Sequence, residues 1–228
     1  MTDDGFAQRV SKVGALSDPI RRALYRFVAR QPGAVSRDQA AEGIEVPRHT
    51  AKFHLDKLVD EGLLTTEFRR LTGRTGPGAG RPAKLYRRTR KEIAVSLPQR
   101  RYDLASHVLA DAVERALDGT PMADALCAAS DQAATDILEQ WPLDDADELS
   151  RVEDVLTRLG YEPRPDGDAL KLGNCPFDRL SADHRELVCG MNRQFVQSLH
   201  DQLGCDHLEA TDVEPGPGCC VRIEQRSS

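Results

Sequence analysis

Charge divides the chain into two unlike halves, and this division most constrains its fold. Residues 1–101 hold 21 Lys and Arg against 11 Asp and Glu, whereas residues 102–228 hold 10 against 26. A chain of 228 residues is long enough for two domains of ordinary size. We therefore expect a basic domain that meets a polyanion, followed by an acidic domain with a different task.

Composition places the chain among globular proteins. Apolar residues make up 39% and charged residues 30%, and no apolar run approaches the roughly 18 residues of a spanning helix. The first ten residues, MTDDGFAQRV, lack the basic and apolar regions of a secretory signal. We therefore expect a cytoplasmic protein in which structural disulfides are rare.

Helical periodicity begins early in the basic half. It predicts a first helix from about residue 18 to 30, begun by Asp18 and Pro19. Ser36 and Gln39 match a capping box that opens a short second helix. The apolar face of the first helix consists of Leu16, Ile20, Leu24, Phe27 and Val28.

A third helix is predicted in RHTAKFHLDKLVDEGLL, after Val46-Pro47. Its apolar positions are Ala51, Leu55, Leu58 and Val59. Three short helices with a tight turn before the last form a helix-turn-helix pattern, whose last helix enters the major groove of DNA. The alternative is an ordinary helical bundle with a solvated polar face. The candidate DNA contacts on this helix are Arg48, His49, Thr50, Lys52, Phe53, His54 and Lys57.

The next segment favours DNA over the plain bundle. From Phe68 to Lys91 the chain carries nine basic residues and no acidic one, and Gly73 to Gly80 has the composition of a turn. Two extended arms around this tip predict a β-hairpin wing whose cations contact phosphate or reach into the minor groove. The candidate wing contacts are Arg74, Arg81, Lys84, Arg87 and Arg88.

Residues 13–90 resemble the winged helix-turn-helix domains of bacterial ArsR-like and DeoR-like regulators. The segments that carry the resemblance are LSDPIRRALYRFV, HLDKLVDEGLL and GRPAKLY. The resemblance implies double-stranded DNA as the partner and transcription regulation as the role. Such proteins usually read two half-sites of an inverted-repeat operator as a two-fold dimer.

Two helical stretches, 102–117 and about 123–141, follow the basic half. They are interpreted either as part of the second core or as a dimerisation element. We expect three regions: a winged helix-turn-helix DNA-binding domain (1–95), a helical linker and dimerisation region (96–145) and a cysteine-rich sensor domain (146–228). The apolar stripe of the first stretch consists of Leu104, Val108, Leu109, Ala112, Val113 and Ala116.

The acidic half mixes helices and strands, so the predicted fold class is α+β. Helices are expected at 148–159 and about 183–203, and a strand at 208–213. Pro165-Asp166-Gly167 predicts the turn of a β-hairpin arm.

Five of the six cysteines lie in the last 54 residues. In a reducing compartment this enrichment indicates metal or redox chemistry. No C-x2-C pair is present, and widely spaced single cysteines suit a cluster held between secondary elements, where each iron needs one thiolate. The alternative is that the cysteines are small buried apolar residues, which we expect of Cys127 and Cys205. The candidate ligands are Cys175, Cys189, Cys219 and Cys220.

The order NCPF, then H…LVC, then CCV, behind a winged helix-turn-helix, resembles the SufR family of iron-sulfur-dependent repressors. The resemblance implies a homodimer, a 4Fe-4S cluster and repression of iron-sulfur cluster assembly genes by the cluster-loaded form. Cys175 and Cys189 are the clear matches, and the third is Cys219 or Cys220. One extra residue between the first two cysteines and the doubled last cysteine depart from the family pattern. They leave the cluster type and the fourth ligand open, with His184 as a candidate.

Other functions use the same residues. One is a zinc- or heavy-metal-responsive repressor. Another is a redox-sensing regulator without a metal, in which Cys219 and Cys220 or Cys205 form reversible disulfides. An enzyme is not indicated, because no phosphate-binding loop, G-x-S-x-G or H-E-x-x-H motif is present. An RNA-binding role lacks aromatic stacking platforms in the basic half.

Overall fold

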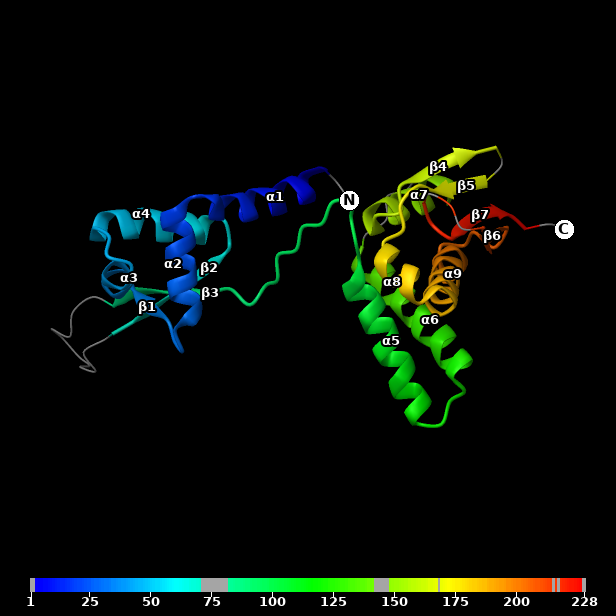
Figure 1. Cartoon of the computed structure of the whole chain (residues 1–228), viewed down its shortest axis with the longest axis horizontal. Helices are drawn as coiled ribbons and strands as arrows, with labels where there is room; N and C mark the ends of the chain where they lie inside the picture. Colours follow the sequence, from blue (N-terminus) through cyan, green and yellow to red (C-terminus); the bar gives the residue numbers. More distant parts are fainter. Residues whose placement is uncertain are drawn as a thin grey trace. The chain divides into compact units, whose positions relative to one another are not determined.

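The computed structural model describes residues 3–70, 82–141, 148–167, 169–214, 216 and 218–226. The chain is α+β and separates into two compact units, with the boundary between Val95 and Ser96 (Figure 1). Within the described ranges, no helix is long and apolar enough to cross a membrane.

The first unit combines a helical layer with a small antiparallel sheet of strand order β1-β3-β2. Its helices are α1 (Asp3–Gly14), the 3-10 turn η1 (Ala15–Ser17), α2 (Pro19–Arg30), α3 (Arg37–Gly43) and α4 (Arg48–Asp60). Its strands are β1 (Val35–Ser36), β2 (Leu64–Arg69) and β3 (Ala83–Arg88). The three predicted helices and the two strands of the predicted wing are therefore confirmed, whereas α1 and β1 were not predicted. The predicted turn from Gly73 to Gly80 lies outside the described residues.

The helix starts follow from local capping chemistry. The side chain of Asp18 accepts a hydrogen bond from the Arg21 amide at 2.9 Å, which satisfies a free N–H of the first turn of α2. Ser36 and Gln39 form the predicted capping box at the start of α3. The sequence alone thus specified where both helices begin.

The core of the first unit lies between α2, α3, α4 and the sheet. Glycine is needed at position 43, since a Cβ atom there would lie 2.0 Å from the Phe27 ring. This close approach lets α3 pack against α2. The fully buried side chains include Leu24, Leu55, Leu58, Leu85 and Tyr86.

The second unit packs five helices with a four-stranded antiparallel sheet of order β4-β5-β7-β6. The helices are α5 (Tyr102–Leu117), α6 (Met122–Gln140), α7 (Glu148–Leu159), α8 (Asp178–Asp183) and α9 (Arg185–Gln202). The strands are β4 (Pro163–Asp166), β5 (Ala169–Leu172), β6 (Leu208–Asp212) and β7 (Val221–Gln225).

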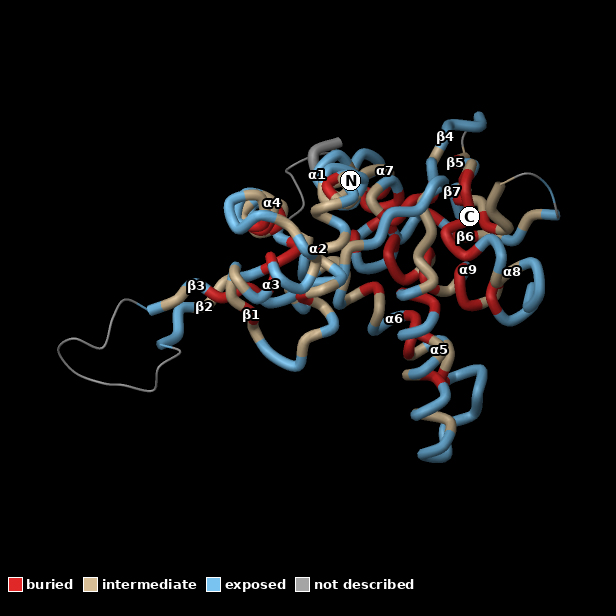
Figure 2. Tube along the Cα trace, turned by 60° about the vertical axis from the view of Figure 1, so that its left-hand side comes forward, coloured by how far each residue is buried: buried red, intermediate tan, exposed pale blue. Residues whose placement is uncertain are grey.

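One core serves the whole second unit. Figure 2 shows buried residues gathered along α9 and the strands. Helices α5 and α6 contribute Leu104, Val108 and Ala125 to the same cluster of buried side chains. The largest fully buried side chains are Tyr161, Phe177, Phe195, Leu156, Leu159, Leu172 and Met191.

The sequence pattern predicts Cys175 at the end of a strand and Cys219 and Cys220 at the start of another, and the structure differs from it in both details. The last strand begins at Val221, so Cys219 and Cys220 belong to the turn before it. Cys175 lies in the loop after β5, because that strand ends at Leu172. The Cys219 amide donates to the Leu172 carbonyl at 2.9 Å and fixes this turn beside the end of β5.

Candidate nucleic-acid interface and thiol site

Helix α4 has one buried and one exposed face. Ala51, Leu55 and Leu58 are buried in the core of the first unit. On the opposite face, Phe53 is 59% exposed, although its ring makes an edge-to-face contact with His54 at a centroid distance of 5.1 Å. A shallow hollow of about 320 Å³ on this face is lined by His49, Lys52, Phe53, Asp56, Lys57 and Asp60. The exposed face thus offers cations and an aromatic ring, which suit phosphates and thymine methyl groups.

The seven α4 candidates are not placed alike. His54 is turned inward: its side chain is 13% exposed, and its Nδ1 lies 4.0 Å from Oδ1 of Asp18 at the start of α2. Thr50 is half-buried. Arg48 is held by Asp38 at 3.5 Å but remains 73% exposed. His54 therefore belongs to the contact between α4 and α2, whereas the other charged candidates lie on the surface.

Asp56 joins the wing to α4. Its Oδ1 lies 2.7 Å from Nζ of Lys84 and accepts a hydrogen bond from the Tyr86 hydroxyl at 2.9 Å. Burial opposes ionisation of Asp56, but the hydrogen bonds from Lys84 and Tyr86 outweigh it and lower its pKa. Burial and the Asp56 carboxylate raise the pKa of Tyr86. The base of the wing is thereby held to the helix that carries the candidate base contacts.

The remaining candidate cations of the wing lie on β3 or outside the described residues. In the β2-β3 ladder, Arg87 pairs with Thr65 and lies 3.8 Å from the Glu67 carboxylate. Arg88 is exposed beside it. Arg74 and Arg81 fall outside the described residues. Lys84 and Arg87 each lie beside a carboxylate, whereas Arg88 has no ion-pair partner among the described residues.

Four cysteine side chains from three segments form a thiol group in the second unit. Cys175 comes from the loop after β5, Cys189 from α9, and Cys219 and Cys220 from the turn before β7. Nδ2 of Asn192, on the same helix as Cys189, lies 3.1 Å from Sγ of Cys219 and 4.0 Å from Sγ of Cys220. Each thiol also shifts the pKa of its neighbour in the order Cys175, Cys219, Cys220, Cys189. We call these four residues the thiol group. The structure thus brings together all four predicted cysteine ligands.

The four thiols shift one another's pKa values in opposite directions. A hydrogen bond from Cys219 lowers the pKa of Cys175 despite burial, and it also lowers the pKa of Cys220, to about 6. The same bonds raise the pKa of Cys219. Burial and Cys220 raise the pKa of Cys189 to about 12. The lowered pKa values of Cys175 and Cys220 favour the thiolate form, which a metal ligand or nucleophile requires, more than the raised values of Cys189 and Cys219 do.

Asn192 and Tyr161 support the thiol group, and the sequence analysis missed both. Asn192 follows Cys189 by one turn of α9, and its Nδ2 donates to Sγ of Cys219 at 3.1 Å. The Tyr161 hydroxyl donates to Oδ1 of Asn192 and so orients the amide. Both side chains are fully buried. The sequence did offer one signal for Asn192, since its amide lies on the apolar face of a predicted helix, three residues after Cys189.

The donor chemistry of the thiol group can be compared with two metal centres. Within the ranges that the structure describes, no group of three or more His, Cys, Asp or Glu side chains is arranged to hold a metal ion. A single zinc ion needs its sulfur ligands to converge at about 2.3 Å, whereas each iron of a cluster takes one thiolate. Four thiols from three segments supply the type of ligand that both kinds of centre use.

The other predicted site residues lie elsewhere. His184 is exposed ahead of the first turn of α9, and its side chain makes no capping hydrogen bond. Cys205 is buried, as expected of a small apolar residue. The same expectation was wrong for Cys127, which is exposed, because it lies on the outward face of α6 while Ala125 and Ala129 are buried.

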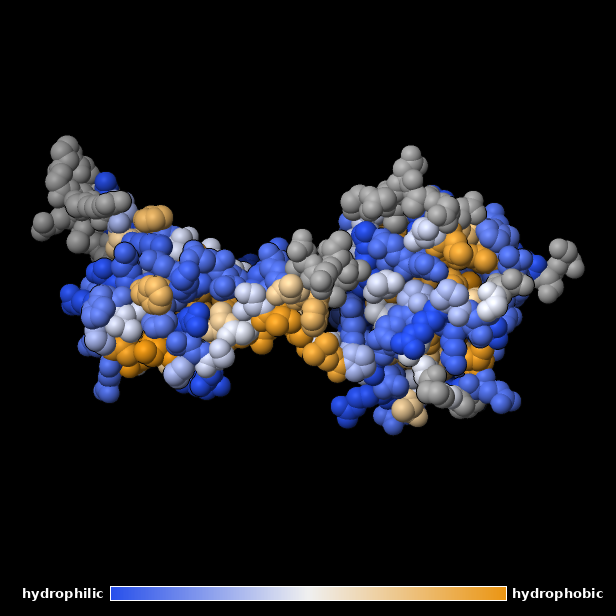
Figure 3. Space-filling model, turned by 90° about the horizontal axis from the view of Figure 1, so that it is seen from above, coloured by the Kyte–Doolittle hydropathy of each residue, from blue (hydrophilic) through white to orange (hydrophobic). Residues whose placement is uncertain are grey.

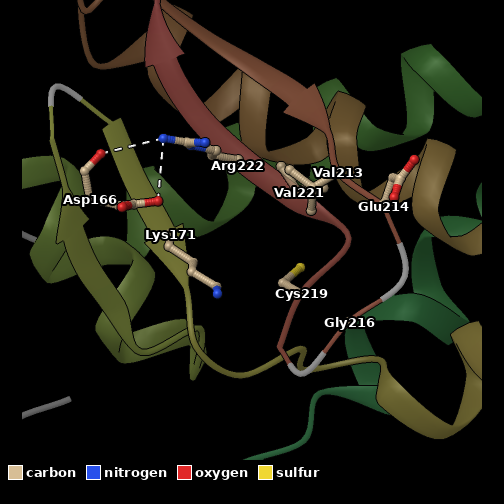
Figure 4. A pocket seen from close by; sticks show the side chains of 8 residues that line it. All are labelled: Asp166, Lys171, Val213, Glu214, Gly216, Cys219, Val221 and Arg222. Atoms are coloured by element: carbon tan, nitrogen blue, oxygen red, sulfur yellow. Dashed lines mark hydrogen bonds and ion pairs between the residues drawn. The ribbon is translucent and has the colours of Figure 1, made fainter.

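A cavity of about 180 Å³ opens beside Cys219. Figure 4 shows its sulfur among side chains of β5, β7 and the turn between β6 and β7. Lys171 and Arg222 bring positive charge to this cavity, and Arg222 is held by Asp166 at 3.3 Å. Cys219 is therefore a member of the thiol group with access from solvent.

Comparison with known proteins bears on the first unit. Helices α2 to α4 with the start of the wing define a winged helix-turn-helix fold, the class of protein that inserts one helix into the major groove. Residues 16–67 match the sequence profile of a family described as a helix-turn-helix domain. A search of curated proteins finds no match. The profile match supports a DNA-binding transcriptional regulator rather than an enzyme.

Proposed function

We propose that the chain is an iron-sulfur-responsive transcriptional repressor. The observation that carries this proposal is the thiol group, four cysteines from three segments that shift one another's pKa, in a unit that continues directly from a helix-turn-helix unit. A regulator needs one part that binds DNA and another whose ligand favours one arrangement of the protein. The two units supply these two parts.

Cys175, Cys189 and one or both of Cys219 and Cys220 would hold a 4Fe-4S cluster. When bound, the cluster would make the protein sensitive to iron supply and oxidants. Asn192 would orient Cys219 through its amide, and the low pKa of Cys220 favours the thiolate that ligation requires. The resemblance to the SufR family suggests iron-sulfur cluster assembly genes as the regulated set.

DNA recognition would fall to the first unit. Lys57 and Phe53 on α4 would contact base edges, while Arg87 and Arg88 of the wing would contact phosphates. Residues 102–228 carry 26 acidic against 10 basic side chains, so phosphate would repel the second unit. This charge division supports an interface confined to the basic unit.

The proposed operator is an inverted repeat bound by a homodimer. Hydrophobic residues form separate patches on the largely hydrophilic face drawn in Figure 3. At the connected ends of α5 and α6, Leu117 is 80% exposed, Met122 50% and Val113 46%. Exposed apolar side chains grouped in this way suit a contact between two copies of the chain. They support the predicted dimerisation role of these helices.

Analysis of protein purified without oxygen tests the proposal. We expect a brown protein that contains iron and sulfide in stoichiometric amounts. Cys175→Ala and Cys189→Ala should lose the iron, the sulfide and the colour. Cys127→Ala is the matched control, because this cysteine is exposed and outside the thiol group. A colourless protein that also fails reconstitution, or one with stoichiometric zinc, contradicts the iron-sulfur function.

A thiol-redox regulator is the second candidate. The pKa of Cys220 is lowered to about 6, and its neighbour Cys219 borders the solvent-accessible cavity. Low pKa and access are the properties of redox-sensing cysteines. In that case peroxide would change DNA affinity in metal-free protein, and a reducing agent would restore it.

A further inference from the structure

The segment that connects the two units is fastened to the loop that carries Cys175. We call residues 96–101 the connector; it begins immediately after Val95, the last residue of the DNA-binding unit, and ends at the start of α5. Its partner is the buried run Asn174 to Phe177. Segments about 75 residues apart in sequence are thereby joined.

Arg100 makes the central contact. Its Nη1 donates to the Cys175 carbonyl at 3.0 Å and to Oδ1 of Asn174. Its Nη2 lies 3.2 Å from the Asp178 carboxylate, and the Arg100 side chain is only 18% exposed. One planar guanidinium thus holds the backbone of a thiol-group residue, the side chain before it and the start of α8.

Backbone and amide contacts flank Arg100 on both sides. The Arg101 amide donates to the Pro176 carbonyl at 3.0 Å. Asn174 Nδ2 donates to the Gln99 carbonyl at 3.0 Å, and Gln99 Nε2 donates to the Arg158 carbonyl at 3.0 Å. Residues 99–101 of the connector are therefore fixed to the Cys175 loop, and Gln99 is also fixed to the end of α7.

The opposite side of the same loop faces the thiol group. The Cys219 amide donates to the Leu172 carbonyl at 2.9 Å, just before the Cys175 loop, and the Cys219 thiol lowers the pKa of Cys175. The carbonyl of Cys175 accepts a hydrogen bond from Arg100. One residue is thus bound through its side chain to the sensor site and through its backbone to the connector. Any displacement of Cys175 that accompanies a change at its sulfur must either move Arg100 or break this contact.

We propose that Arg100 is the positioning residue that transmits the state of the thiol group to the DNA-binding unit. The inference rests on the proposed function, because it requires that a ligand at the cysteines alters DNA affinity. The physical basis is linkage: a ligand that favours one position of the Cys175 loop also favours one position of the connector. Without the guanidinium, the loop and the connector would keep only the contacts of Gln99 and Arg101, so their coupling would weaken.

Arg100→Gln in the full chain tests the inference, with Arg115→Gln as the matched control. Arg115 is also an arginine of the second unit, but it pairs only with Asp111 of its own helix, at 3.0 Å. Iron and sulfide content measures loading. DNA affinity is measured with loaded and metal-stripped protein on a duplex selected from a random pool by the loaded wild type.

We expect the wild type and Arg115→Gln to differ by about tenfold in affinity between the loaded and stripped states, a typical size for coupling between sites. Arg100→Gln should load as the wild type does, with the two affinities within about twofold of each other. An unchanged ratio in normally loaded Arg100→Gln overturns the inference and leaves the proposed function intact. A wild type that takes up no iron, or that binds DNA equally in both states, overturns both.

Amide hydrogen exchange on the wild type keeps the inference testable if Arg100→Gln fails to fold or load. The Arg101 amide reports the contact directly, since it donates to Pro176. We expect loading to slow exchange at residues 99–101 as well as at 174–178. Slower exchange confined to 174–178 would show that the connector does not follow the thiol group, and would overturn the inference.

Discussion

Replacing Asp56 tests whether the wing and α4 form one rigid element. The Tyr86 hydroxyl donates to this carboxylate at 2.9 Å, and a part-buried hydrogen bond to a charged group contributes about 1.5–3 kcal/mol. The Lys84 ion pair has side chains 39% and 34% exposed, so after solvent screening it adds at most about 0.5 kcal/mol. We therefore expect Asp56→Ala to destabilise the first unit by about 2–3 kcal/mol at pH 7, and Tyr86→Phe by about 1–2 kcal/mol.

The effect should depend on pH in a defined direction. The pKa of Asp56 is lowered in the folded state, so its stabilisation is complete above the unfolded value near 3.8. It is lost as the pH falls below that value towards the folded pKa. The difference between wild type and Asp56→Ala should therefore be constant from pH 7 to 5 and shrink below about pH 4.

Chemical denaturation followed by circular dichroism and by amide exchange in α2 and α4 measures the effect. The single tryptophan, Trp141, reports the second unit and should show no change. Asp60→Ala is the control, because Asp60 is an exposed acid on the same helix. If Asp56→Ala and Tyr86→Phe each lower the free energy of unfolding by less than about 0.5 kcal/mol, the reasoning is refuted, because ordinary surface substitutions have effects of that size.

Other predictions concern DNA contacts and packing. Lys57→Ala should weaken binding to a selected duplex by about 1–3 kcal/mol and relax the sequence preference of the protein. Arg88→Ala should weaken binding to all duplexes equally and lower the slope of log affinity against log salt concentration by about one. Gel shifts at several salt concentrations distinguish the two effects. Gly43→Ala should destabilise the first unit by about 1–3 kcal/mol, because the added methyl group would overpack against Phe27. Gly33→Ala is the control and should not destabilise it, because a Cβ atom there meets nothing within 4 Å. Thermal denaturation measures both variants. Tyr161→Phe should destabilise the second unit by about 1–3 kcal/mol in denaturation followed by tryptophan fluorescence, because a buried amide oxygen loses its donor.

The sequence predicted those parts of the fold that local chemistry determines. Asp18 and the Ser36-Gln39 pair specify helix starts by hydrogen bonds within three residues, and the wing follows from alternating arms around a Gly-rich tip. The inward turn of His54 was not predictable in this way. Its neighbour Asp18 lies on another helix, so its orientation depends on how α2 and α4 pack.

The thiol group shows the same division between local and tertiary information. The type and number of its cysteines were visible in the sequence, but the order of their sulfurs in space was not. Antiparallel pairing of Leu170 with Ile223 places the end of β5 beside the start of β7, and so brings the Cys175 loop to Cys219. Only this pairing, together with the buried face of α9, makes Asn192 a partner of Cys219. Because the contacts of Cys175, Cys189 and Asn192 with Cys219 and Cys220 join different elements, the chemistry of the group depends on the packing of the whole second unit. Core substitutions far from the cysteines should therefore alter it as well.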